Sequence, residues 1–195
     1  MLLKFTTDTE LSLMVFNFAS KNYLSFKIYK MNTTSEQKRK VHQVITSSEL
    51  LAHWQGHRQL TRRVIEAFPE DKFFEYSIGG MRSFSEMITE LLSIAVPGLR
   101  EIVTGKTSEL KEHVEHENRK DKMLQLWDES THDINMYWSQ LSDERFHETI
   151  KAFGMYEGTV LSSLLYFIDN EIHHRGQGYV YLRSLGIEPP AFWER

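Results

Sequence analysis

Apolar side chains recur at the spacing of an α-helix in the segment 47–68, the first clearly patterned part of the chain. They stand three or four positions apart and define one inward face: Leu50, Trp54, His57, Thr61, Val64 and Phe68. Ser47 or Ser48 is suited to cap the start of this helix. Pro69 marks its end, because the residue before a proline disfavours helical backbone.

Three further segments have helical character, at residues 83–103, 122–141 and 159–185. We expect Pro97 to kink or split the first of them. The second has an apolar stripe of its own: Leu124, Trp127, Thr131, Ile134, Trp138 and Leu141. The third ends at Gly186, and Pro189 and Pro190 follow. Four helices of matched length bury their stripes best against one another, so the pattern predicts an all-α four-helix bundle.

The intervening segments are predicted to be connections. Residues 70–82 form a loop in which Gly79 and Gly80 permit positive φ. Residues 105–121 are strongly charged and partly loop, and residues 142–158, with two glycines, form a long connection.

The last predicted helix has two opposite stripes. From Thr159 to His174 its only formally charged residues are Asp169 and Glu171, so we expect it to be largely enclosed. The apolar stripe is Leu161, Leu165, Ile168, Ile172 and Tyr179. The polar stripe is Ser163, Tyr166, Asn170, His174, Gln177 and Tyr181. Enclosed polar side chains must find hydrogen bonds or a metal ion.

The first 31 residues have neither helical nor alternating periodicity. We interpret residues 1–31 as an N-terminal extension outside the bundle, which occupies residues 45–195. A β-hairpin packed on the bundle is the rival interpretation. The apolar segment 11–19 resembles a signal-peptide core, but Asp8 and Glu10 stand where positive charge is expected.

Composition narrows the classes of function. The chain of 195 residues has a formal net charge of −4 and no cysteine. We therefore expect no disulfides, no thiol nucleophile and no cysteine-ligated metal. The acidic balance argues against nucleic-acid partners, and no apolar stretch is long enough to span a membrane. A cytoplasmic location is the simplest expectation.

Candidate chemistry lies on the second and fourth helices. Asn170 and His174 are i, i+4 neighbours whose side chains can converge on one ion. Glu90 is the only charged residue between Met87 and Val96, so its carboxylate needs a partner, either a metal or an Arg or Lys. His53 and His57 form another i, i+4 pair. A hydrogen-bonded structural role for each histidine remains open.

The segment Asp169-Asn170-Glu171-Ile172-His173-His174-Arg175-Gly176-Gln177 and its continuation to Pro190 resemble the C-terminal signature of the DinB/YfiT-like superfamily. The segment Gly80-Met81-Arg82-Ser83-Phe84-Ser85-Glu86-Met87 resembles the start of that family's second helix. The resemblance covers roughly residues 45–192. It implies a four-helix bundle in which three histidines hold a divalent metal.

The three ligand positions implied by the resemblance are Glu90, Asn170 and His174, of which only His174 retains the family's residue type. This carboxylate–amide–imidazole set should bind zinc more weakly than three imidazoles and suits a harder ion such as manganese or iron; nickel is a further candidate. The resemblance further suggests a hydrolase or thiol transferase acting on a small-molecule substrate. Candidate pocket residues are Tyr166, His173, Gln177 and His57.

Two other functions stay open at this point. One is a metal-free module that binds a small molecule or takes part in a stress response. The other is a structural bundle that forms a homodimer and has no catalytic activity.

Overall fold

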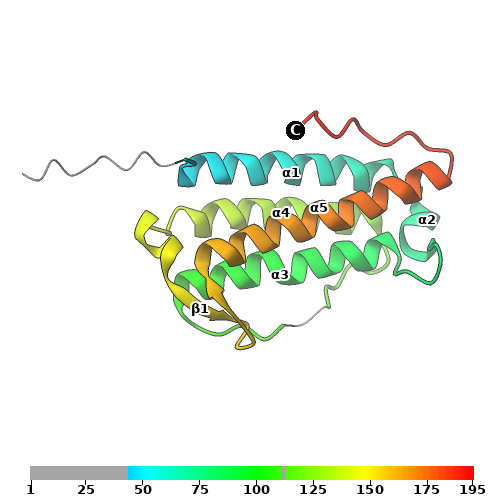
Figure 1. Ribbon diagram of the computed structural model, residues 1–195. Coiled ribbons are helices and arrows are strands. Elements are labelled where there is room, and N and C mark those ends of the chain that lie inside the picture. Colours follow the sequence, from blue (N-terminus) through cyan, green and yellow to red (C-terminus); the bar gives the residue numbers. More distant parts are fainter. Residues whose placement is uncertain (1–43, 111–112) are drawn as a thin grey trace, which may run out of the picture. The chain divides into compact units, whose positions relative to one another are not determined.

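The computed structural model describes residues 44–110 and 113–195, which belong to one compact unit, His42–Arg195. Its four long helices are α1 (Ser47–Ala67), α3 (Phe84–Thr104), α4 (Lys120–Trp138) and α5 (Val160–Ser184). They lie side by side in Figure 1, and α1 and α3 each pack against both α4 and α5. The predicted four-helix bundle is confirmed. The predicted extension of residues 1–31, its rival hairpin and the segment 11–19 lie outside the described residues.

Polar side chains cap three of the long helices. Thr46 caps α1 and forms a capping box with Glu49, so the prediction that Ser47 or Ser48 is the cap was wrong by one position. Ser83 and Glu86 form the same reciprocal box at the start of α3. Thr159 accepts a hydrogen bond from the Ser162 N–H at the start of α5. Each cap satisfies backbone donors that have no partner within the helix.

Helix α3 runs without interruption through Pro97. Of the expected kink or split, the split is absent, because α3 is packed against α4 and α5 and this packing holds the helix together around the missing backbone donor. The Ser108 hydroxyl donates to the Pro97 carbonyl at 3.2 Å, which fastens the loop after α3 to this part of the helix.

Two predicted connections contain structure of their own. The short helix α2 (Glu70–Glu75) lies between α1 and α3, ahead of Gly79 and Gly80, which have positive φ as expected. Residues 142–158 contain a 3₁₀ helix, η1 (Asp143–His147), and most of an antiparallel hairpin, β1 (Thr149–Ala152) and β2 (Tyr156–Thr159). The sequence pattern did not predict the hairpin. Its strands are four residues long, and Ala152 is the one residue buried in them, so they show no clear alternation of apolar and polar positions. The hairpin lies at the opposite end of the bundle from α2 in Figure 1.

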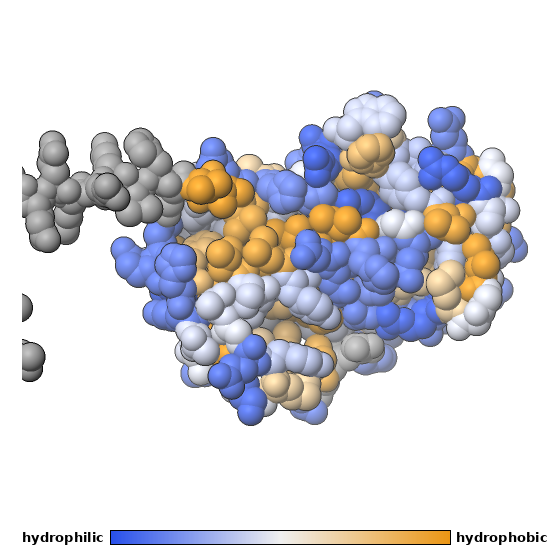
Figure 2. All heavy atoms as spheres, viewed as in Figure 1, coloured by the Kyte–Doolittle hydropathy of each residue, from blue (hydrophilic) through white to orange (hydrophobic). Residues whose placement is uncertain are grey.

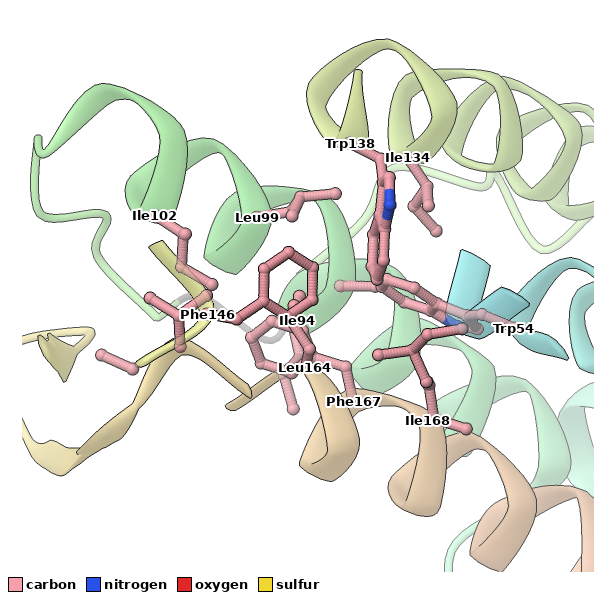
Figure 3. Packing of buried hydrophobic residues seen from close by; sticks show 14 of the residues in the cluster. Trp54, Ile94, Leu99, Ile102, Ile134, Trp138, Phe146, Leu164, Phe167 and Ile168 are labelled. Carbon is pink, nitrogen blue, oxygen red and sulfur yellow. The ribbon is translucent and has the colours of Figure 1, made fainter. Parts of the chain in front are cut away.

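The core is filled mainly by large side chains from all four long helices. Figure 3 shows its hairpin end, where Trp54 of α1, Trp138 of α4 and Phe167 of α5 meet; the two indoles lie 6.0 Å apart. The stripe predicted for α1 is buried throughout. On α4 the buried face is rotated from the expected stripe, because Met123 and Ser130 are buried while Leu124 and Thr131 are only half-buried.

The prediction for the two faces of α5 was partly wrong. Leu165 and Ile172 of the expected apolar stripe are 41% and 37% exposed, and Figure 2 shows apolar residues gathered on this face, over α5 and its border with α1. Glu171 and Arg175 are buried instead. They can face the core because their charges are paired there, which the hydrophobic pattern does not reveal.

None of the helices in the described part of the chain is both long enough and apolar enough to cross a membrane.

Candidate functional site

Glu90, Asn170 and His174 come together between α3 and α5. Asn170 Nδ2 donates to Glu90 Oε1 at 3.0 Å, and His174 Nε2 lies 3.2 Å from the same oxygen. The i, i+4 spacing on α5 places the amide and the imidazole on one face, opposite the carboxylate. The side chains of His174 and Glu90 are only 7% and 13% exposed. The residues singled out from the sequence therefore form one partly enclosed polar cluster.

Arg82 is the member of this cluster that sequence reasoning did not identify. It precedes α3, and its Nη2 donates to Glu90 Oε2. The Tyr181 hydroxyl donates to the Arg82 carbonyl at 2.9 Å and fixes the backbone of this turn against α5. An Arg or Lys partner for Glu90 had been one of the two expectations, but eight positions separate the residues, and no periodic rule pairs a loop residue with a helix residue at that distance.

The hydrogen bonds around Glu90 keep its carboxyl ionised. Burial by itself raises the pKa of this group, but the hydrogen bonds from Arg82 and Asn170, together with the contact with the His174 ring, outweigh burial and leave the pKa below its ordinary value. The site therefore presents the negatively charged carboxylate of Glu90 to any ligand or metal ion bound between α3 and α5.

Gln177 orients the imidazole of His174. Gln177 Oε1 lies 2.7 Å from His174 Nδ1, and with the amide oxygen facing the ring, Nδ1 carries the ring proton and donates a hydrogen bond to it. The other amide end of Gln177 faces the Met81 sulfur. In the neutral ring, His174 Nε2 then presents a lone pair toward the Glu90 carboxylate. A hydrogen atom on Nε2 or a metal ion between the two atoms makes this contact favourable.

A cavity of about 270 Å³ adjoins the cluster, with Glu90 in its wall. Tyr166 also lines it and is 55% exposed. His173 is exposed, with its ring centre 5.0 Å from that of His174. Of the four candidate pocket residues, Tyr166 belongs to the described lining of this cavity, whereas His173 and Gln177 lie beside His174 and outside that lining.

His57 belongs to a different cluster, on the side of α5 that faces α1. Its Nδ1 accepts a hydrogen bond from Arg175 Nη2 at 2.8 Å, and its Nε2 lies 3.1 Å from both His53 Nε2 and Arg195 Nη1. Desolvation, assisted by Arg175, His53 and Arg195, lowers the pKa of His57 to about 3. His57 is therefore a neutral acceptor that holds Arg175.

Next to this cluster lies a buried ion pair network centred on Glu171. Its carboxylate accepts hydrogen bonds from Thr61 and Trp54, at 2.7 and 3.2 Å, and lies 3.8 Å from guanidinium nitrogens of Arg58 and Arg175. Arg58 also covers the Trp127 ring. Desolvation raises the pKa of Glu171 and lowers that of Arg58 to about 10. Its members pair mainly with one another, so this network connects α1, α4 and α5, and Arg58 Nη1 is its buried nitrogen without a hydrogen-bond partner among the described residues.

The donor atoms of the trio suit a divalent cation. Adjacent ligands whose bonds to one ion are about 2.1 Å long lie about 3 Å apart, as the Glu90 oxygen and its two neighbours do. A half-turn of the Asn170 amide would present its oxygen to the ion. The described residues contain no cluster of three His, Cys, Asp or Glu side chains with metal-binding geometry, so a metal at this site depends on the amide.

The chain belongs to the DinB family, whose model matches residues 31–195. The uncharacterised protein YjoA of Bacillus subtilis (strain 168) is 24% identical over 153 residues, which are 76% of this chain and 97% of YjoA. The match to the family model confirms the predicted family membership.

Solved structures confirm the fold. A DinB-like protein of Bacillus cereus ATCC 10987 superposes with a TM-score of 0.62 at 15% identity, over 75% of this chain and 97% of that one. The YjoA structure gives 0.59 at 21% identity, over 75% and 99%. A mycothiol-dependent maleylpyruvate isomerase gives 0.53 at 15% identity, over 67% of this chain and 60% of the isomerase.

Proposed function

We propose that this protein is a divalent-metal-dependent enzyme that acts on a small molecule bound beside Glu90, Asn170 and His174. The observation that carries the proposal is the orientation of His174. Its Nδ1 lies 2.7 Å from Gln177 Oε1, and its Nε2 lies 3.2 Å from Glu90 Oε1. A histidine that binds a metal commonly donates its other ring N–H to such an oxygen acceptor, which fixes the ring and makes it a better ligand.

The chain supplies few ligands, so other coordination positions remain for a water molecule or a substrate atom. A metal held there would lower the pKa of bound water or of a thiol and so supply a nucleophile. The reaction is then of the hydrolase or thiol-transferase type. The mycothiol-dependent isomerase supports this proposal, because it is a thiol-dependent enzyme on the same fold.

The residues around the trio have definable tasks. Glu90 supplies negative charge and a hard oxygen, and Asn170 supplies a neutral oxygen. Together with one imidazole this set favours manganese or iron more than a three-histidine site does. Arg82, which donates to the second carboxylate oxygen, holds Glu90 in place and leaves Oε1 to face Asn170 and His174.

A second candidate function is a metal-free binding module, and the Arg82–Glu90 ion pair is the observation that favours it. In that arrangement the guanidinium supplies the positive charge that a metal would otherwise supply. Asn170 and a doubly protonated His174 then complete the hydrogen bonds of the carboxylate.

Calorimetric titration of Mn²⁺, Fe²⁺, Ni²⁺ and Zn²⁺ into untagged, chelator-treated protein separates the two candidates. We expect one site per chain that His174→Ala abolishes. The matched control His173→Ala, at the exposed neighbouring position, should retain the site. Arg82→Gln should bind the metal at least as well as the native protein, because it removes a competing cation. Absence of binding in both the native protein and Arg82→Gln would overturn the metal-dependent enzyme.

A further inference from the structure

The cavity beside Glu90 lies between the β1–β2 hairpin and helices α3 and α5. The side chains at its inner end are mainly apolar. Those at its outer end are tyrosines, serines and a glutamate. The described lining residues from the bundle and the loop after α3 are Glu90, Ile94, Leu110, Ser162, Ser163, Tyr166 and Phe167. Those from the hairpin are Ala152, Phe153, Tyr156, Glu157 and Gly158. Its volume of about 270 Å³ is near the lower end for organic ligands, so it suits a small one.

Two phenylalanine rings form its inner wall against α3. Phe153 and Phe167 are both buried, and they approach the helix where it lacks a side chain, at Gly98. A Cβ atom on Gly98 would lie 2.5 Å from the Phe167 ring and 3.1 Å from the Phe153 ring. Glycine at this position therefore lets both rings withdraw toward α3 and leaves space beside Glu90.

Phe153 is held in an unfavourable backbone conformation. Its φ of 53° lies in the left-handed region, which a bulky residue rarely adopts. The buried carboxylate of Glu101 fixes it there, because Oε1 accepts the Phe153 N–H at 3.0 Å while Oε2 accepts the Ser108 N–H at 2.8 Å. Strained residues of this kind cluster at ligand sites, where the surrounding structure enforces them. Here the enforced conformation places an aromatic ring in the wall of the cavity.

The negative charge of the lining residues disfavours binding of an anionic ligand. Of the described lining residues, Glu90 and Glu157 are the charged ones, and both are acidic. Tyr156 and Tyr166 at the outer part present aromatic faces, which attract apolar groups and cations. A ligand with a carboxylate or phosphate in this cavity would meet like charge at the exposed Glu157 and at Glu90, whose charge Arg82 balances in part.

We propose that the cavity under the hairpin binds a small aromatic or similarly sized apolar group that is neutral or positively charged, with the polar end of the ligand toward Glu90. The claim that this ligand is the substrate rests on the proposed function. Binding itself does not, because the walls and the charges of the cavity are present without a metal.

Ligand-observed ¹⁹F NMR with three matched probes tests this proposal on the full chain. The probes are 4-fluorobenzyl alcohol, 4-fluorobenzylamine and 4-fluorobenzoate, which have similar size and differ in charge. We expect the alcohol and the amine to bind metal-free protein, and the benzoate to bind at least about tenfold more weakly because of repulsion by the two carboxylates. The protein is kept metal-free because a bound metal ion would attract the carboxylate of the benzoate.

Variants localise the binding. Ser163→Leu fills the cavity and should abolish binding of the alcohol, whereas Asp169→Leu, at an exposed position of α5 outside the lining, should retain it. Glu157→Gln, at the exposed edge, should narrow the difference between the alcohol and the benzoate without affecting folding. Equal binding of all three probes, binding unaffected by Ser163→Leu, or no binding of the alcohol and the amine would each overturn the proposal. Probe binding without any metal binding would refute the proposed enzyme and leave the cavity's ligand class intact.

Discussion

His174 directs Nε2 at Glu90 Oε1 from 3.2 Å while its Nδ1 lies 2.7 Å from Gln177 Oε1. The amide oxygen contacts one ring nitrogen, and the carboxylate faces the other. The imidazole is placed where it and Glu90 can bind the same metal ion. This relationship joins a residue of α3 to two residues of α5 and defines the place where chemistry is proposed.

The weakest ligand of the proposed set is Asn170, which the DinB/YfiT-like resemblance aligns with a histidine. Asn170→His replaces an amide oxygen by an imidazole nitrogen, so the affinity for zinc should rise by roughly tenfold or more. Competition with a chromophoric chelator measures this change. Asn170→Ala is the matched control and should bind zinc more weakly than the native protein. Equal affinities for all three proteins would show that position 170 does not contact a metal.

The Glu171 network is predicted to support the fold, not the chemistry. Glu171→Ala leaves Arg58 and Arg175 buried without their shared carboxylate, and it should lower the free energy of unfolding by about 3–5 kcal/mol. Urea denaturation measures the loss. Glu66→Ala removes an exposed carboxylate from its pair with Arg62 and should cost less than about 1 kcal/mol. Similar losses for the two variants would contradict the structural role of the buried network.

His57 should make stability depend on pH. Its pKa falls from 6.5 to about 3 on folding, mainly because burial disfavours the charged ring. Between these values the unfolded chain binds a proton that the folded chain does not, so the free energy of unfolding decreases as pH falls from about 6.5 toward 3. Urea denaturation at successive pH values should show a smaller decrease for His57→Gln. The exposed control His132→Gln should follow the native protein, and a native slope in His57→Gln would contradict the argument.

Two glycines on α5 make a matched pair. A Cβ atom on Gly178 would lie 2.5 Å from the buried Phe84 ring, whereas a Cβ atom on Gly176 meets nothing within 4 Å. Gly178→Ala should therefore destabilise the protein by about 1–3 kcal/mol through overpacking. Gly176→Ala should stabilise it by up to about 1 kcal/mol, because alanine is the better helix former. Thermal denaturation distinguishes the two, and equal effects would show that α5 is not packed on Phe84 in this way.

The fold was predictable where local signals and burial agree. The stripe from Leu50 to Phe68 identified α1, and Gly186 marked the end of α5 at positive φ. The hairpin at 149–159 was not predictable, because four-residue strands with one buried side chain carry too little alternation. The faces of α5 were misassigned because Glu171 and Arg175 are buried as an ion pair, and the second partner of Glu171, Arg58, is distant in sequence.

The candidate site was predictable as a set of positions but not as a set of contacts. An isolated carboxylate at Glu90 and the i, i+4 pair of Asn170 and His174 were visible in the sequence. The ion pair with Arg82 was not, because a loop residue can lie in many places relative to a helix. The strained conformation of Phe153 also left no local signal, since the fixing carboxylate of Glu101 comes from α3.

The most direct test of the metal site is the anomalous difference density of crystals grown with Mn²⁺ or Zn²⁺ from untagged protein, with data collected on both sides of the metal's absorption edge. The account predicts one peak between α3 and α5, about 2.0–2.2 Å from Glu90 Oε1 and His174 Nε2, with the Asn170 oxygen turned toward it. Crystals of His174→Ala should lack this peak. Density that shows Glu90 bonded to Arg82, Asn170 and His174, with no anomalous peak among them at saturating metal, would contradict the central claim.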